Sequence, residues 1–305
     1  MLAAYTLWLL FWQNDLLYLI DSFTWSSYKL AILCAIICMT PLNWGLEAIK
    51  WKTAMQPFTI DLRNSLRSVL SGVTIGLITP ARLGEYAGRM LYIPNDQRVW
   101  SGLATLRCSL AQSTITFSAG ILSLLWISTN QEFSFLGIDP KLILVLSVVL
   151  LVLTIFIYLR IDLVLPWINR IVELFRNRLG MTIQTHTDRI SVSIYHQMQI
   201  LSYAVIRYLV YLSQYALMLL VFGFDQSLLS IAAGISLVFL VQSLVPVPAV
   251  AKVFARTGAA AAIFSLLGYE NLEVILASLL LWVINLLLPA LCGLVLLLRK
   301  ERELN

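Results

Sequence analysis

The sequence predicts an all-α, polytopic integral membrane protein with about six spanning helices and two re-entrant helical hairpins in an inverted repeat. Of its 305 residues, 60% are hydrophobic and 12% are charged, whereas a soluble domain carries about 25% charged residues. Apolar runs of the roughly 20 residues that a bilayer core requires recur along the chain, and two further apolar runs break at proline. We therefore expect one membrane domain over residues 1–305.

The spanning helices are predicted from apolar runs that are separated by short polar connections. The first run is interrupted by Gln13-Asn14-Asp15, and the last contains Asn285 and Pro289. The six expected spans are residues 2–20, 28–49, 99–128, 142–160, 201–222 and 272–298. The first repeat is expected over 28–160 and the second over 201–298.

The first re-entrant hairpin is expected over residues 62–93. Its apolar run breaks at Thr79-Pro80, because proline lacks a backbone N–H and pushes the preceding residue out of the helical region. A broken backbone at membrane depth is tolerated only where it is buried in protein or lines a wet cavity. The helix that resumes after the break would carry Arg82, Glu85 and Arg89 at i, i+3 and i+7, on one face.

The second re-entrant hairpin is expected over residues 228–267. Its first half stops at Val245-Pro246-Val247-Pro248, and its second half carries Lys252 and Arg256 four residues apart. Inverted repeats with broken helices that meet near the midplane are typical of many secondary transporters. A chance pairing of two kinked hairpins remains the alternative.

The orientation follows from the basic residues of the connections. Lys and Arg concentrate in 50–67, in 160–189 and in the C-terminal tail, which predicts that these segments and both termini are cytoplasmic. Residues 161–200 are expected to form an amphipathic connector at the interface. The predicted location is a bacterial-type inner membrane.

The two hairpin tips together predict a basic site. If the tips meet, four basic residues and one acid share a cavity, with a net charge of +3. Arginine is suited to bidentate contact with phosphate or carboxylate, and helix N-termini after the breaks would add partial positive charge. An anionic membrane lipid is therefore the predicted partner. The site residues are Arg82, Glu85, Arg89, Lys252 and Arg256, and the residues of the helix breaks are Pro80, Gly84, Pro246 and Pro248.

A structural interpretation of the same charges stays open. Arg82 and Glu85 would then form an internal ion pair, while the other basic residues extend to the interface. Further polar residues could line the cavity or serve as helix–helix hydrogen bonds. They are Arg107, Gln112, Arg207, Gln214 and Asn285.

The sequence predicts no catalytic residue, no metal and no cofactor. It contains no Asp-x-Asp pair and no glycine-rich nucleotide loop, and its four cysteines lie in apolar segments without CxxC spacing. The basic residues fall between apolar runs instead of forming one basic face, which argues against nucleic acid as a partner. A homo-oligomer is possible.

Gly72-Val-Thr-Ile-Gly76 and the run from Thr79 to Glu85 followed by Arg89 resemble the lysylphosphatidylglycerol synthase transmembrane family. This family of flippase-like proteins includes the membrane half of the multiple peptide resistance factor. Its first signature, Pro-x-Arg-[Leu/Ile]-Gly-Glu with a later basic residue, is matched by residues 80–85 and 89. Its second signature is Pro-x-Pro-Gly-Gly with a later acidic residue. This chain differs from it, since residues 246–250 are Pro-Val-Pro-Ala-Val and are followed by Lys252 and Arg256 instead of an acidic residue.

The resemblance implies translocation of a phospholipid or a polyprenyl phosphate. Aminoacyl transfer in the two-part relatives belongs to a separate soluble domain, for which we expect no room in this chain. The alternative is a membrane enzyme of lipid-linked glycosyl transfer or phospholipid modification. A scaffold is a weaker alternative, because scaffolds rarely need buried arginine.

Overall fold

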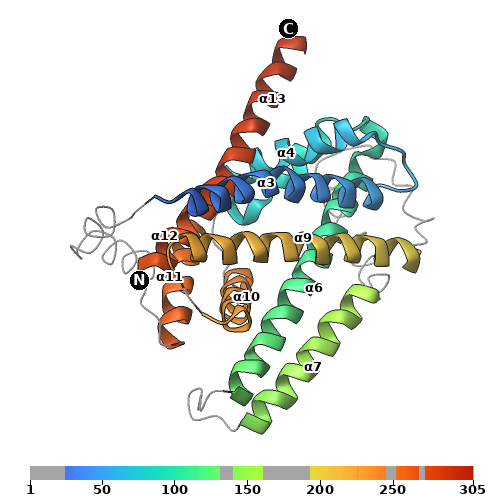
Figure 1. Ribbon diagram of the computed structural model, residues 1–305. Coiled ribbons are helices and arrows are strands. Elements are labelled where there is room, and N and C mark those ends of the chain that lie inside the picture. Colours follow the sequence, from blue (N-terminus) through green and yellow to red (C-terminus); the bar gives the residue numbers. More distant parts are fainter. Residues whose placement is uncertain are drawn as a thin grey trace.

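The computed structural model describes residues 25–130, 140–160, 193–224, 226–244, 252–267 and 272–304, and every regular element in these ranges is a helix (Figure 1). Two 3-10 turns, Pro80–Arg82 and Asn95–Gln97, and one π-helical turn, Val283–Leu287, connect longer helices. The α-helices are α3 (Ser27–Ala54), α4 (Leu62–Ile78), α5 (Gly84–Met90), α6 (Arg98–Asn130), α7 (Pro140–Leu159), α9 (Ile194–Val221), α10 (Leu228–Leu244), α11 (Lys252–Leu266), α12 (Leu272–Trp282) and α13 (Leu288–Leu304).

Four segments of the described chain are long and apolar enough to cross a membrane. They are Ser27–Ala54, Asn95–Ser128, Ile194–Val221 and Leu272–Lys300, and they correspond to four of the six expected spans. The expected span 142–160 forms α7, whose apolar part, Leu144–Leu159, is shorter. The expected first span, residues 2–20, lies outside the described residues, as does most of the connector, 161–192.

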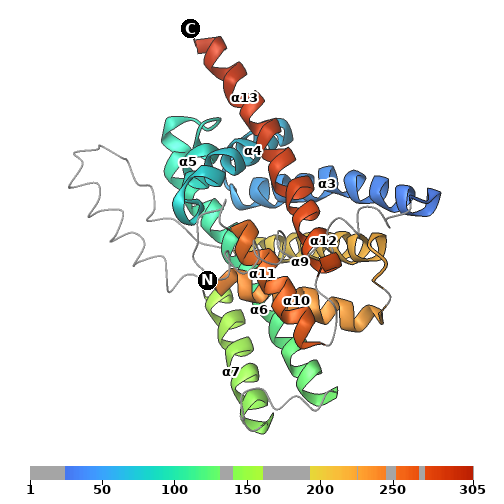
Figure 2. The same cartoon turned by 90° about the vertical axis from the view of Figure 1, so that its left-hand side faces the viewer.

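The chain breaks at Pro80 as the sequence predicts. α4 ends at Ile78, and Thr79 is extended with φ −101° and ψ 145°. After the break α5 folds back along α4, as Figure 2 shows. Glycines bring the two helices together, since a Cβ added at Gly88 would lie 2.6 Å from the Cα of Gly72. The 17 residues of α4 rise only about 25 Å, less than the roughly 30 Å of a bilayer core.

The structure describes the two helices of the second expected hairpin, and its tip lies outside the described residues. α10 and α11 pack against each other, and a Cβ added at Gly234 of α10 would lie 2.8 Å from the ring of Phe264. The predicted breaks at Pro246 and Pro248 lie outside the described residues.

Helices α3 and α9 pack side by side in the middle of the molecule (Figure 1). Gln214 of α9 contacts Thr40 of α3, whereas Arg207 contacts Glu47. A later residue in one helix therefore meets an earlier residue in the other, so the two run antiparallel. Two apolar clusters flank this pair, one containing Ile36 with α9 to α12 and one containing Trp51 with α4 and α6.

Candidate functional site

A buried carboxylate, Glu47, is the centre of a charged cluster. It forms ion pairs with Lys50 at 2.6 Å, with Arg89 at 2.9 Å and with Arg207 at 3.1 Å. These partners come from α3, α5 and α9, so three separate elements converge on one side chain. The expected span 28–49 ends too early, because α3 continues to Ala54, and Glu47 and Lys50 are both buried within it. The charged i, i+3 pair between apolar neighbours was the available signal.

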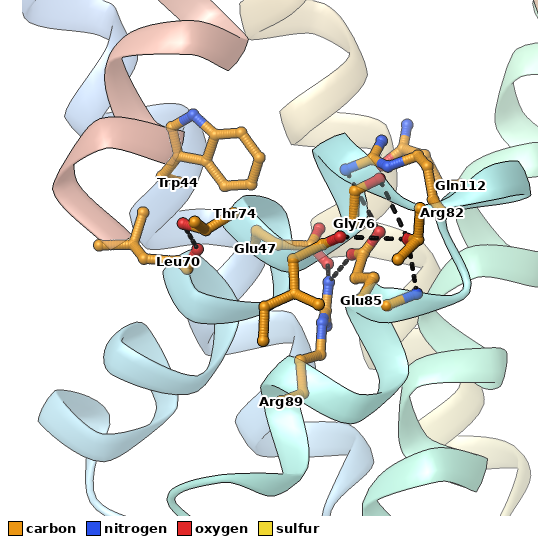
Figure 3. A network of polar contacts seen from close by, with 12 residues as sticks. Trp44, Glu47, Leu70, Thr74, Gly76, Arg82, Glu85, Arg89 and Gln112 are labelled. Carbon is orange, nitrogen blue, oxygen red and sulfur yellow. Dashed lines mark hydrogen bonds and ion pairs between the residues drawn. The ribbon is translucent and has the colours of Figure 1, made fainter. Parts of the chain in front are cut away.

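Glu85 is the second carboxylate of the cluster. It accepts a hydrogen bond from Arg89 and pairs with Arg82 at 3.2 Å. The guanidinium of Arg89 points toward Glu47 and Glu85 (Figure 3). The structure thus brings Arg82, Glu85 and Arg89 together, and the Arg82–Glu85 ion pair exists. Arg89 does not extend to an interface, since its side chain is only 2% exposed.

The backbone at Arg82 differs from the prediction. Arg82 does not lie on the same α-helix as Glu85, because it ends the 3-10 turn Pro80–Arg82 with a φ of 59°. This left-handed conformation is uncommon for a side-chain-bearing residue and costs on the order of 1–3 kcal/mol. The surrounding hairpin holds it. The hydroxyl of Thr79 accepts the N–H of Gly84 at 2.8 Å, and a Cβ at Gly84 would lie 2.6 Å from the carbonyl oxygen of Ile75.

Two backbone N–H groups at the helix start after Pro80 are used within the hairpin. The N–H of Gly84 donates to the hydroxyl of Thr79, and the N–H of Tyr86 donates to the carbonyl of Leu83. These two groups are therefore not directed at an anion.

The cluster carries more positive than negative charge. Four basic side chains meet two carboxylates, which leaves a net charge of +2. The amide oxygen of Gln112 adds an uncharged acceptor, 3.4 Å from Nζ of Lys50 and 3.3 Å from Nη1 of Arg207. Within the described residues, Arg107 instead donates to the carbonyl of Ala54, at the end of α3.

Two basic side chains of the cluster are partly exposed. The side chains of Arg82 and Arg207 are 32% and 20% exposed, whereas Lys50 and Arg89 are almost completely buried. The Nε atoms of Arg82, Arg89 and Arg207 are buried and have no hydrogen-bond partner among the described residues. We call Arg82 and Arg207, the two partly exposed arginines of the cluster, the arginine edge.

A network of buried amides adjoins the cluster. Asn285, in the π-helical turn, donates to Gln214 at 3.0 Å and accepts from Asn43 at 3.3 Å. Its carbonyl accepts the indole N–H of Trp44 at 3.1 Å. The guanidinium of Arg207 lies 5.2 Å from the ring centre of the same tryptophan. Trp44 therefore connects the charged cluster to the junction of α12 and α13.

Arg256 lies apart from this cluster. It is buried on α11 among three aromatic rings, those of Tyr211, Tyr215 and Phe239. In the described part of the chain, no hydrogen bond or ion pair joins it to the charged cluster. Lys252 begins α11, but its side chain is outside the description. Of the five charged residues that were expected to share a cavity, the structure therefore brings together Arg82, Glu85 and Arg89.

Comparison with known proteins identifies a family. Among curated proteins, none matches the chain. A family model does match, that of the lysylphosphatidylglycerol synthase TM region, and it covers residues 1–293. This family consists of membrane proteins of lipid metabolism or transport, and the apolar helices agree with that class. The chain therefore belongs to the lysylphosphatidylglycerol synthase TM region family.

Proposed function

We propose that the protein is a flippase-like lipid transporter that binds an anionic lipid headgroup at the arginine edge. The observation that carries this proposal is the unbalanced charge of the cluster. A net charge of +2 is gathered beside apolar helices, and two of its arginines, Arg82 and Arg207, are partly exposed. Charged groups at membrane depth are costly, and a bound anion lowers that cost.

The chemistry of the edge favours a phosphate-bearing lipid. Arginine presents a planar fork that matches phosphate oxygens bidentately. Glu85 and Arg89 would hold Arg82 in place through their ion pairs, while the headgroup contacts Arg82 and Arg207. The acyl chains would stay in the surrounding lipid. Lys252, with the breaks at Pro246 and Pro248, remains a predicted part of the second half-site.

The proposed transport cycle uses an inverted repeat. The antiparallel packing of α3 and α9, and the shortness of α4 and α10, support corresponding halves with re-entrant hairpins. The halves would rock against each other around the fixed headgroup site. In this arrangement both termini are cytoplasmic, and the protein resides in a bacterial-type inner membrane.

Native mass spectrometry of the detergent-purified protein tests the headgroup site. We expect an anionic lipid to be retained by the wild type and by Arg63→Gln, whose arginine is exposed on α4. We expect Arg82→Gln to retain less of that lipid than the wild type, by the share bound at the arginine edge, while its helical content is unchanged. Equal lipid occupancy in all three proteins would mean that the arginine edge is structural.

A second experiment separates transport from chemistry. The protein is reconstituted in vesicles with a fluorescent phosphatidylglycerol, and the lipid accessible on each leaflet is measured by quenching. Transport predicts lipid that changes leaflet without chemical change, and a loss of this movement in Arg82→Gln. A chemically altered lipid, found by mass spectrometry after incubation with a sugar donor, would support the membrane-enzyme alternative instead.

A further inference from the structure

Arg256 occupies an aromatic enclosure formed by three helices. The Cζ atom of Arg256, on α11, lies 5.2 Å from the ring centre of Tyr211 and 5.1 Å from that of Tyr215, both on α9. The ring of Phe239, on α10, lies at 5.9 Å and is stacked on Tyr211 with an interplanar angle of 5°. Figures 1 and 2 both show α10 beside α9 and α11.

Among the described residues, hydrogen bonds engage only one side of the Arg256 guanidinium. Nη1 donates to the hydroxyl of Tyr211. Nε and Nη2 have no hydrogen-bond partner in the part of the chain that the structure describes, although Arg256 is only 4% exposed. These two N–H groups point the same way in the guanidinium plane, and this is the pair of donors that grips two oxygens of one oxyanion.

The positive charge of Arg256 also has no acidic partner in the part of the chain that the structure describes. Among the described residues no carboxylate forms an ion pair with it, in contrast to the arginines around Glu47. Aromatic rings attract a cation through their faces, but they accept no hydrogen bond at the guanidinium edge. A buried guanidinium with two unused donors is costly unless another group pairs with it.

We propose that the Nε/Nη2 edge of Arg256 is a second oxyanion site, distinct from the arginine edge, that binds a phosphate group. The phosphate is either free or part of a lipid headgroup. Tyr211 acts as a positioning residue, because its hydroxyl binds Nη1 and its ring covers one side of the guanidinium. This inference does not depend on transport. It concerns the second repeat, where residues 246–250 differ from the second family signature.

The test measures stabilisation by ligand in a background that lacks the other site. A ligand that binds only the folded protein raises the unfolding temperature in a saturable way. Detergent-purified Arg82→Gln is titrated with inorganic phosphate at ionic strength held constant by chloride, and separately with short-chain phosphatidylglycerol below its micellar concentration. The same titrations are made on Arg82→Gln/Arg256→Gln.

We expect saturable stabilisation of Arg82→Gln by at least one of the two ligands, and its loss when Arg256 is also replaced. Stabilisation by phosphate alone identifies a free oxyanion as the ligand, and stabilisation by the lipid alone identifies a headgroup. Arg256→Lys in the same background keeps the charge but not the paired donors, so its dissociation constant should rise about tenfold, equivalent to one bidentate contact.

Two results would overturn the site. One is the absence of saturable stabilisation of Arg82→Gln by either ligand. The other is equal affinity in Arg82→Gln and in its Arg256→Lys derivative, which would show that the paired donors are not used. Neither result affects the headgroup proposal, because that rests on lipid retention by the wild type and its loss in Arg82→Gln.

Discussion

Replacing Glu47 by Gln removes the carboxylate on which three basic residues converge. The amide is similar in size, so the change is one of charge, and the net charge of the cluster rises from +2 to +3. Lys50 and Arg89 are 1% and 2% exposed and lie 2.6 Å and 2.9 Å from the carboxylate. Breaking one buried ion pair costs about 3–5 kcal/mol, because it leaves an uncompensated charge.

The expected total is about 3–5 kcal/mol and not three times that value. Arg207 is 20% exposed, so water replaces part of its interaction with Glu47. Arg89 keeps its ion pair with Glu85, and effects within one network are not additive. Lys50 bears most of the loss, since Glu47 is its ion-pair partner in the described chain and Gln112 offers only an amide oxygen at 3.4 Å.

Equilibrium unfolding in mixed micelles measures this loss of stability. Asp96→Asn is the matched control, since it makes the same carboxylate-to-amide change at an exposed position and should stay within about 0.5 kcal/mol of the wild type. Glu47→Gln/Lys50→Met restores the net charge of +2 and should recover at least about 1 kcal/mol. A loss below about 1 kcal/mol in Glu47→Gln, or no recovery in the double variant, would refute the reasoning that buried charge balance holds the cluster.

Two further predictions concern helix packing. Gly88→Ala should lower the free energy of unfolding by several kcal/mol and separate α4 from α5, because its Cβ would lie 2.6 Å from the Cα of Gly72. Gly45→Ala is the matched control, because nothing lies within 4 Å of the added atom, and it should stabilise the protein by about 0.5–1 kcal/mol. A similar unfolding free energy for the two variants would contradict the close approach. Asn285→Leu leaves Gln214 and Asn43 without their buried partner and should cost about 1–3 kcal/mol. An unchanged unfolding midpoint for this variant would show that water replaces the lost amide.

The elements that backbone chemistry dictates were predictable from the sequence. The break at Pro80 appears where proline requires it, with Thr79 extended before it. Four spans follow directly from apolar length. The conformation of Arg82 could not be predicted, because a φ of 59° is unfavourable for this residue locally and is imposed by the packing of the hairpin.

The sequence predicted several residues of the site better than it predicted which residues they contact. Arg82, Glu85 and Arg89 were recognised because a motif places them near a break. Glu47 was not, since a charged residue near the end of an apolar run usually marks the membrane surface. Its role depends on which helix faces which, and the sequence does not specify that. The aromatic surroundings of Arg256 had a signal in the sequence. The tyrosines at 208, 211 and 215 are spaced so that they line one face of α9.

The π-helical turn Val283–Leu287 holds one residue more than an α-helical turn would hold at the same place. Each residue of an α-helix advances the chain by about 100°, but a π turn takes up its extra residue locally. Deleting one residue here would therefore return the turn to α-helix and leave the faces of α13 nearly unchanged. Gly293, whose added Cβ would lie 2.3 Å from the carbonyl oxygen of Leu70, would still face α4. The same deletion between the turn and Gly293 would rotate that glycine away from α4, so the π turn is the place in this helix where a change of chain length is compatible with the packing of α13.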